Sequence, residues 1–166
     1  NVMDLEASLA WYHQHLGIIV SERLKPGGEG GPLIGIFSRC DRGEKPADHH
    51  SLFFLPAEVQ SKGNTGLNHV SYEMVDIDDV FMGHEILDKQ GYELEWGIGR
   101  HYQGSQIFDY WRSPFGHIHE HQTDGDVFDN TFLPQVADVM LGGGPQQPGN
   151  GALSMGTTNQ HGNFWR

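Results

Sequence analysis

Cysteine is almost absent from this chain of 166 residues, which contains only Cys40. A single cysteine excludes an internal disulfide framework and a zinc site built from cysteines. It fits a reducing compartment, and we expect a cytoplasmic protein. Long apolar runs are missing as well, and no stretch is long enough to cross a bilayer as a helix.

Positive charge is scarce too, since 10 Lys and Arg stand against 22 Asp and Glu and the net charge is −12. Such an acidic surface argues against binding to nucleic acid or to anionic membranes. What the chain holds in excess is glycine, with 23 residues, and histidine, with 11. Nearly all the histidines precede residue 124, whereas many glycines follow it.

Two stretches of the chain repeat one pattern. A helix is expected after the N-cap Asp4, and Gly17 fits its end. A second helix is expected after Asp76 or Asp78 and ends at Gly91, with the same acidic start and the same glycine stop. The predicted strands around them cover residues 18–23, 33–38, 50–55, 67–74, 92–96, 105–111 and 117–121.

This repeat predicts an α+β fold of paired β-α-β-β-β modules whose sheets curl. The modules are expected at residues 1–60 and 66–123, followed by a Gly/Pro-rich tail at 124–166. The first module lacks its leading strand, which we expect upstream of Asn1, so that the chain is expected to be a fragment. Residues 142–151 of the tail cannot bury a core, and we expect the tail to be mobile or to lie over a neighbouring subunit of a homo-oligomer.

The predicted hairpin from residue 105 to residue 121 contains the first candidate site residues. Strand parity places Tyr110 on one face of the first strand and Glu120 on one face of the second. If these faces are shared, the carboxylate points inward between aromatic residues and requires a partner such as a metal ion. The alternative is a surface hairpin in which Glu120 is solvated.

His69 lies on the leading strand of the second module. A His on one strand and a Glu on the last strand of the same curved sheet can converge, and a third imidazole would complete the two-His-one-carboxylate triad typical of Fe(II). By the repeat, that third ligand falls upstream of Asn1. The alternative for His69 is a polar residue on a half-buried strand.

His49 and His50 open the last strand of the first module, and an imidazole there can move protons because its pKa lies near neutrality. Two loop histidines are the alternative. His117, His119 and His121 share the face opposite Glu120 by parity. The remaining histidines of the two helices are interpreted as surface or packing residues, and they are His13, His15 and His84.

A family resemblance adds to these observations. The residues that carry it are His50-Ser51, Gly66-Leu67-Asn68-His69, Gly99-Arg100-His101, and Phe108-Asp109-Tyr110 through Ser113-Pro114-Phe115-Gly116 to Glu120. Together they resemble the C-terminal domain of type I extradiol ring-cleaving dioxygenases, the catechol 2,3-dioxygenase-like enzymes of the vicinal oxygen chelate superfamily. The match covers roughly residues 1–125, with nine residues from His101 to Tyr110 and ten from there to Glu120.

The resemblance implies a glyoxalase/dihydroxybiphenyl dioxygenase-like fold with sheets curled around a metal site. It implies His69 and Glu120 as ligands of Fe(II), for which Mn(II) can substitute. His50 would be the acid/base beside the oxygen site, and His101 and Tyr110 would contact the catechol hydroxyls. The implied reaction is extradiol (meta) cleavage of a catecholic ring by O₂ in aromatic-compound degradation.

Two other functions stay open on the sequence. One is another chemistry of the same superfamily, such as a glyoxalase-like isomerase or lyase, which would not need His50, His101 and Tyr110 together. The other is a metal-free module that keeps the fold and binds a small aromatic molecule. The second of these predicts that added iron changes nothing.

Overall fold

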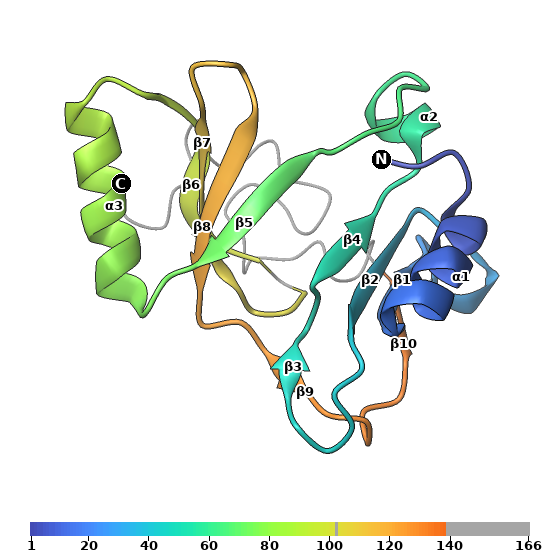
Figure 1. Ribbon diagram of the computed structural model, residues 1–166. Helices are drawn as coiled ribbons and strands as arrows, with labels where there is room; N and C mark the ends of the chain where they lie inside the picture. The colour runs from blue at the N-terminus through green and yellow to red at the C-terminus, as the bar shows by residue number, and fades with distance from the viewer. Residues whose placement is uncertain (102, 139–166) are drawn as a thin grey trace. The chain divides into compact units, whose positions relative to one another are not determined.

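The computed structural model of the chain describes residues 1–101 and 103–138, apart from the side chains of residues 59 and 60. Its elements divide between two compact units. Among the described residues, the first unit comprises residues 1–67 and 126–138, and the second comprises residues 68–101 and 103–125. Figure 1 labels the α-helices and strands of both units.

The first unit contains a mixed four-stranded sheet in the order β10-β1-β2-β4 and a two-stranded sheet of β3 and β9. Its elements are α1 (Leu5–Leu16), β1 (Ile18–Leu24), the short 3₁₀ helix η1 (Gly28–Gly30), β2 (Gly35–Cys40), β3 (Ala47–Asp48), β4 (Leu52–Phe54), α2 (Ala57–Gln60), β9 (Val127–Phe128) and β10 (Gln135–Ala137).

Helix α1 begins and ends where its sequence predicts. The Asp4 carboxylate accepts a hydrogen bond from the backbone N–H of Ala7, and Gly17 ends the helix in the left-handed conformation with φ of 66°. Glycine adopts this conformation without a steric penalty, so Gly17 lets the chain turn directly into β1. Leu9 of the helix packs with Ile18 and Ile36 in the core beneath it.

The second unit is a four-stranded sheet in the order β5-β8-β7-β6 with one helix. Strand β5 runs parallel to β8, and the other neighbours are antiparallel. Helix α3 packs against β6, β7 and β8 over a core that contains Val80, Ile98 and Ile107. The elements are β5 (His69–Glu73), α3 (Ile77–Lys89), β6 (Glu93–Arg100), β7 (Ile107–Arg112) and β8 (Ile118–Thr123).

The two units repeat the same helix followed by three antiparallel strands, which confirms the predicted α+β architecture. Their registers correspond closely. In the first unit Glu22 pairs with Phe37, which pairs with Phe53. In the second unit Trp96, Tyr110 and Glu120 form the matching row. A register shift directly precedes the first member of each row, between residues 20 and 22 and between residues 94 and 96.

Several strand boundaries differ from the predicted ones. Strand β4 is three residues long and begins at Leu52, so that His50 precedes it. Strand β2 starts and ends two residues later than predicted, and β6 extends to Arg100. Strand boundaries respond to pairing with neighbouring strands as well as to local composition, which explains such shifts of a few residues.

The segment after residue 125 contributes two short strands that the sequence pattern did not predict. Strand β9 pairs with β3, and β10 adds to the edge of the first sheet parallel to β1. The buried guanidinium of Arg39 donates hydrogen bonds of 3.1 Å to the carbonyl oxygens of both Asp129 and Phe132. This arginine ties the segment to the sheet of the first unit. The glycine-rich residues 142–151 lie outside the described residues.

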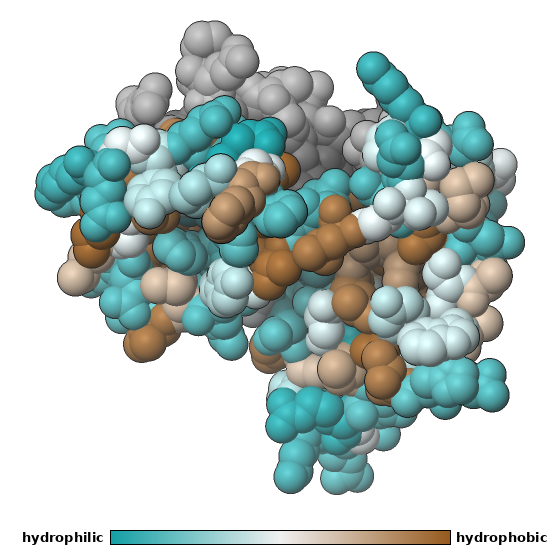
Figure 2. Space-filling model, turned by 45° about the horizontal axis from the view of Figure 1, so that its top comes forward, coloured by the Kyte–Doolittle hydropathy of each residue, from teal (hydrophilic) through white to brown (hydrophobic). Residues whose placement is uncertain are grey.

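The surface shown in Figure 2 is predominantly hydrophilic, with separate patches where hydrophobic residues reach solvent. This agrees with the net charge of −12. Among the described residues, no helix is both long enough and apolar enough to cross a membrane.

Candidate functional site

The site begins at the hairpin of β7 and β8. Tyr110 pairs directly with Glu120, so both side chains leave the same face of the sheet, as strand parity predicts. Both are buried, with 5% of Tyr110 and 1% of Glu120 exposed. A carboxylate at this depth requires polar partners, because an isolated buried charge is very costly.

Three side chains of the same unit supply those partners. Gln106 donates a hydrogen bond of 3.0 Å from Nε2 to the Oε1 atom of Glu120. The Nε2 atom of His69 lies 3.3 Å from Glu120 Oε2, and Nε2 of His101 lies 3.8 Å from Oε1. His69 reaches the carboxylate because β5 pairs parallel with β8 and places Ser71 opposite Glu120 and His69 two residues earlier on the same face.

These partners decide the charge of Glu120. Burial by itself would raise the pKa of the carboxyl group, but hydrogen bonds and charge interactions from His101 and His69 outweigh it and hold the pKa far below its ordinary value. Glu120 is therefore an anion, and its carboxylate can accept hydrogen bonds or bind a cation.

The tautomer of His69 follows from its other ring nitrogen. Nδ1 lies 2.9 Å from the side-chain oxygen Oδ1 of Asn68, so the Nδ1–H group donates to that oxygen. In the neutral ring this places the lone pair on Nε2, which faces the carboxylate of Glu120 at 3.3 Å. Two electron-pair donors so close together are stable only with a shared cation, either a proton on His69 or a metal ion.

His101 and Tyr110 form a second polar pair beside the carboxylate. Nε2 of His101 lies 3.1 Å from the Tyr110 hydroxyl oxygen. Burial, followed by the charge of Glu120 and the hydrogen bond to it, raises the pKa of Tyr110 well above its ordinary value. The phenol therefore keeps its proton and serves as a hydrogen-bond donor.

Aromatic rings surround this polar pair. Trp96 lies nearly parallel to Tyr110, with 5.5 Å between ring centroids, and His101 stacks on Phe108 at 4.2 Å. Trp96, Phe108 and Tyr110 form one buried cluster with Ile118 packed against it. A flat aromatic ligand would find parallel ring faces here, the geometry in which aromatic groups attract each other.

The donor set fits a divalent metal ion in part. One imidazole nitrogen and one carboxylate oxygen are ligands that Fe(II) and Mn(II) both accept. No group of three or more His, Cys, Asp or Glu side chains arranged to hold a metal occurs within residues 1–101 and 103–138. The described residues thus supply His69 and Glu120 toward a site that requires at least one more ligand.

The remaining candidate, His50, belongs to the first unit. Its ring packs 4.6 Å from that of Phe37, and its Nδ1 atom lies 3.0 Å from Nδ1 of His49. His49 is the more deeply buried of the two, with 2% exposed. Of the five predicted residues, the structure therefore brings His69, His101, Tyr110 and Glu120 together within the second unit.

Sequence reasoning missed two polar contacts. Gln106 has the strand parity of Phe108 and Tyr110, so the same alternation that identified Tyr110 also identifies Gln106. His84 was interpreted as a surface or packing residue, whereas its Nδ1 atom lies 3.0 Å from the buried carboxylate of Asp109. That contact joins helix α3 to strand β7 on the face opposite Tyr110, and no sequence spacing indicates it.

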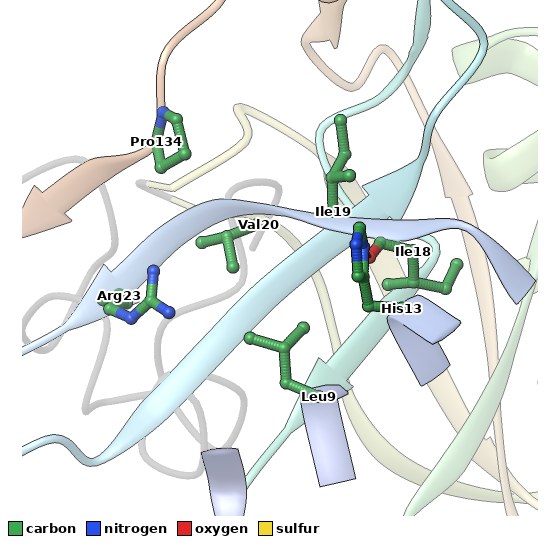
Figure 3. Close-up of a pocket in the computed structure, with 7 residues that line it drawn as sticks. All are labelled: Leu9, His13, Ile18, Ile19, Val20, Arg23 and Pro134. Atoms are coloured by element: carbon green, nitrogen blue, oxygen red, sulfur yellow. Dashed lines mark hydrogen bonds between the residues drawn. The ribbon is translucent and has the colours of Figure 1, made fainter. Parts of the chain in front are cut away.

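A cavity of about 240 Å³ opens elsewhere, in the first unit (Figure 3). Leu9 and His13 of α1 line it, together with residues of β1 and Pro134. His13 is held there through a contact of 3.0 Å between Nδ1 and the carbonyl oxygen of Ile18. The lining has no carboxylate and none of the candidate site residues, so this cavity is distinct from the site described above.

Comparison with known proteins identifies the family. Residues 1–120 match the model of the Glyoxalase/Bleomycin resistance protein/Dioxygenase superfamily. The chain belongs to this superfamily, which is also called the vicinal oxygen chelate superfamily, and the family resemblance of its motifs is confirmed at that level.

A curated relative and several solved structures resemble the chain. Metapyrocatechase 2 of Cupriavidus necator is 28% identical over 123 residues, which are 74% of this chain and 34% of that protein. The chain thus spans about a third of the relative's length.

Two solved structures agree with the fold. A Mn(II)-bound glyoxalase from Novosphingobium aromaticivorans superposes with a TM-score of 0.64 at 29% identity, covering 79% of this chain and 38% of that one. The 2,2',3-trihydroxybiphenyl 1,2-dioxygenase of the dibenzofuran-degrading Sphingomonas wittichii strain RW1 has a TM-score of 0.64 at 20% identity, with coverages of 82% and 45%. The second likeness concerns the fold alone.

Proposed function

We propose that this chain contains metal-binding residues of an extradiol dioxygenase that opens a catecholic ring with O₂ at a mononuclear Fe(II). The observation that carries the proposal is the pair of His69 and Glu120. An imidazole lone pair oriented by Asn68 faces a buried carboxylate at 3.3 Å, an arrangement that calls for a cation between them.

The substrate class follows from the groups beside that pair. The Tyr110 hydroxyl and Nε2 of His101 lie within 3.1 Å of each other and together can bind the two adjacent oxygens of a catechol. The ring faces of Trp96 and Phe108 suit a flat aromatic ligand. A relative whose name denotes a catechol-cleaving enzyme, metapyrocatechase 2, supports the same class.

A bound Fe(II) would supply the one-electron chemistry that lets O₂ react with an aromatic ring. The residues of this chain have separate tasks. His69 and Glu120 would hold the ion, and Gln106 orients the carboxylate through its 3.0 Å hydrogen bond. Tyr110 retains its proton and would donate a hydrogen bond to a substrate oxygen. For His50 of the first unit, the family resemblance implies the role of an acid/base.

Mn(II) is the alternative ion, because the same nitrogen and oxygen donors bind it. The alternative reaction is an isomerisation or lyase step of the glyoxalase kind, which the similarity to a Mn(II)-bound glyoxalase supports. The hydrogen-bonded pair of His101 and Tyr110 favours the dioxygenase, since two adjacent hydroxyls of one substrate require two such partners.

The test is anaerobic reconstitution of the full-length protein with Fe(II) or, separately, with Mn(II). Catechol and a 3-substituted catechol are added, oxygen is admitted, and the yellow ring-opened product is followed by absorbance. Glu120→Gln is measured beside Glu73→Gln, a control that removes one charge from an exposed position on the neighbouring strand. We expect yellow product in the wild type and the control, and a loss of at least about 100-fold in Glu120→Gln.

The other outcomes point to the alternatives. Metal that binds without yellow product would contradict ring cleavage and favour another reaction of the superfamily. Protein that binds neither ion would contradict the metal site and favour a module that binds a small aromatic molecule.

A further inference from the structure

The second unit contains one buried hydrogen-bond donor beside the candidate site that the site does not use. The indole N–H group of Trp96 has no acceptor among the described residues, although only 5% of Trp96 is exposed. Nearly all buried polar groups of folded proteins are hydrogen-bonded, because a buried donor without an acceptor is costly. An acceptor that arrives with a ligand would satisfy this N–H group.

The register of the sheet places Trp96 on the face of the candidate site. Trp96 pairs with Tyr110, which pairs with Glu120, so the three side chains leave the same face of neighbouring strands. Register shifts flank Trp96 on both sides, between residues 94 and 96 and between residues 97 and 99. Bulges of this kind re-aim a side chain, and they are frequent beside active sites.

The same row sets the distance of Trp96 from the proposed metal ligand. Adjacent strands are about 4.8 Å apart, so the backbone of Trp96 lies two spacings, or about 10 Å, from that of Glu120. Tyr110 lies between them, and the ring of Trp96 is 5.4 Å from that of His101. Trp96 is therefore placed for a substituent of a ring whose hydroxyls are bound by Tyr110 and His101, and not for the hydroxyls themselves.

Neighbouring aromatic rings hold the indole in place. The ring centroid of Phe108 lies 4.0 Å from that of Trp96, and Tyr110 is nearly parallel to Trp96 at 5.5 Å. Gly99 makes room for Phe108, because a Cβ atom at residue 99 would lie 2.5 Å from Cζ of that ring. The buried cluster of Trp96, Phe108 and Tyr110, with Ile118 against it, contains no cationic side chain. Since a buried carboxylate needs a cation, this N–H group suits a neutral acceptor.

We infer that Trp96 is a specificity-determining residue whose indole N–H donates a hydrogen bond to a neutral acceptor on the ring of the substrate. The substrate class is then a catechol with a hydroxyl, alkoxy or carbonyl substituent, in preference to an alkyl or carboxylate substituent. The inference rests on the proposed function for the catechol itself. The position of Trp96 and its unpaired N–H group are features of the second unit alone.

Anaerobic binding tests the inference without turnover. The full-length protein is loaded with Fe(II), and calorimetry measures the dissociation constants of two pairs of catechols of similar size. The pairs are 3-methoxycatechol with 3-ethylcatechol and 4-methoxycatechol with 4-ethylcatechol. In at least one pair the methoxy compound should bind about three- to tenfold more tightly, the effect of one neutral hydrogen bond. Equal affinities within both pairs would overturn the inference. Tighter binding of 3,4-dihydroxybenzoate than of either methoxy compound would contradict the preference for a neutral acceptor.

Two variants test whether Trp96 causes the preference. Trp96→Phe retains an aromatic ring and removes the N–H group, so the methoxy and ethyl compounds of each pair should bind equally. Trp11→Phe removes an exposed indole of the first unit and should retain the preference of the wild type. An unchanged preference in Trp96→Phe would contradict the role of Trp96. The comparison within each pair in the wild type remains decisive where Trp96→Phe does not fold.

Admission of oxygen separates this inference from the proposed function. Yellow product from catechols that show no methoxy preference would overturn the role of Trp96 and leave the dioxygenase standing. A methoxy preference that disappears in Trp96→Phe, without ring cleavage of any of these catechols, would contradict the proposed function and leave the role of Trp96 standing. A wild-type protein that binds none of the catechols would contradict both.

Discussion

Glu120 lies directly opposite Tyr110 across strands β7 and β8, and the carboxylate acts on the phenol beside it. The charge of Glu120 and a hydrogen bond to it add to burial in raising the pKa of Tyr110. The pair therefore presents two groups side by side. The carboxylate of Glu120 is an anion that can bind a cation, and the neutral hydroxyl of Tyr110 can donate a hydrogen bond to a ligand oxygen. One step of strand register would send Glu120 to the opposite face of the sheet and separate the two.

Because the pKa of Tyr110 is raised, we expect one tyrosine of the metal-free protein to ionise at a higher pH than the others. Because the folded-state pKa lies above the unfolded value, the neutral phenol stabilises the fold fully below the unfolded pKa, and this contribution is lost as the pH rises through the folded pKa. In an alkaline titration followed by tyrosinate absorbance, one of the five tyrosines should ionise only as the protein unfolds.

Two variants test whether the tyrosine that ionises last is Tyr110. The late component should disappear in Tyr110→Phe and persist in Tyr92→Phe, whose side chain is exposed. A Tyr110→Phe titration that still contains the late component would show that another tyrosine is responsible.

Replacement of Gln106 is expected to lower the affinity for the metal although it removes no metal ligand. Its amide donates to Glu120 Oε1 at 3.0 Å, and Gln106→Leu removes the hydrogen bond that orients the carboxylate. Removal of such an orienting group typically weakens metal binding about 10–100-fold. Competition between the protein and a chelator for Mn(II) measures the change. Gln14→Leu, on an exposed position of α1, should bind as the wild type does, and an equal affinity in Gln106→Leu would refute the orienting role.

Replacement of Asp109 is expected to lower the stability of the fold. Its buried carboxylate accepts from Nδ1 of His84 at 3.0 Å and from the indole N–H of Trp111. Asp109→Ala removes the acceptor of the buried indole N–H of Trp111, and a buried donor left unsatisfied costs about 1–3 kcal/mol. The free energy of unfolding, measured with denaturant, should fall by that amount.

The matched control lies on the helix that Asp109 helps to hold. Asp88→Ala, at an exposed position of α3, should stay within about 0.5 kcal/mol of the wild type. Equal stabilities of Asp109→Ala and Asp88→Ala would mean that the pair of Asp109 and His84 does not stabilise the fold.

Local features of the fold were accessible from the sequence. Asp4 and Asp76 cap helices α1 and α3, and Gly17 ends the first, because caps and stops depend on residues only a few positions apart. Alternation placed Tyr110 and Glu120 each on one face of its strand, and the register of the hairpin made that face a shared one. Both inferences depend on residues within one element or within one tight hairpin, and the sequence shows such local patterns directly.

Contacts between distant residues were decided by the tertiary structure alone. The pair of His84 and Asp109 requires a helix to pack on a sheet, and β10 joins β1 across more than a hundred residues of chain. Glu22 meets His49 because a register shift in β1 breaks the simple alternation that parity assumes. The sequence by itself therefore determined the two long helices, most of the sheet strands, the family and the candidate residues. Packing and register decided which of those residues meet, since both depend on the whole chain at once.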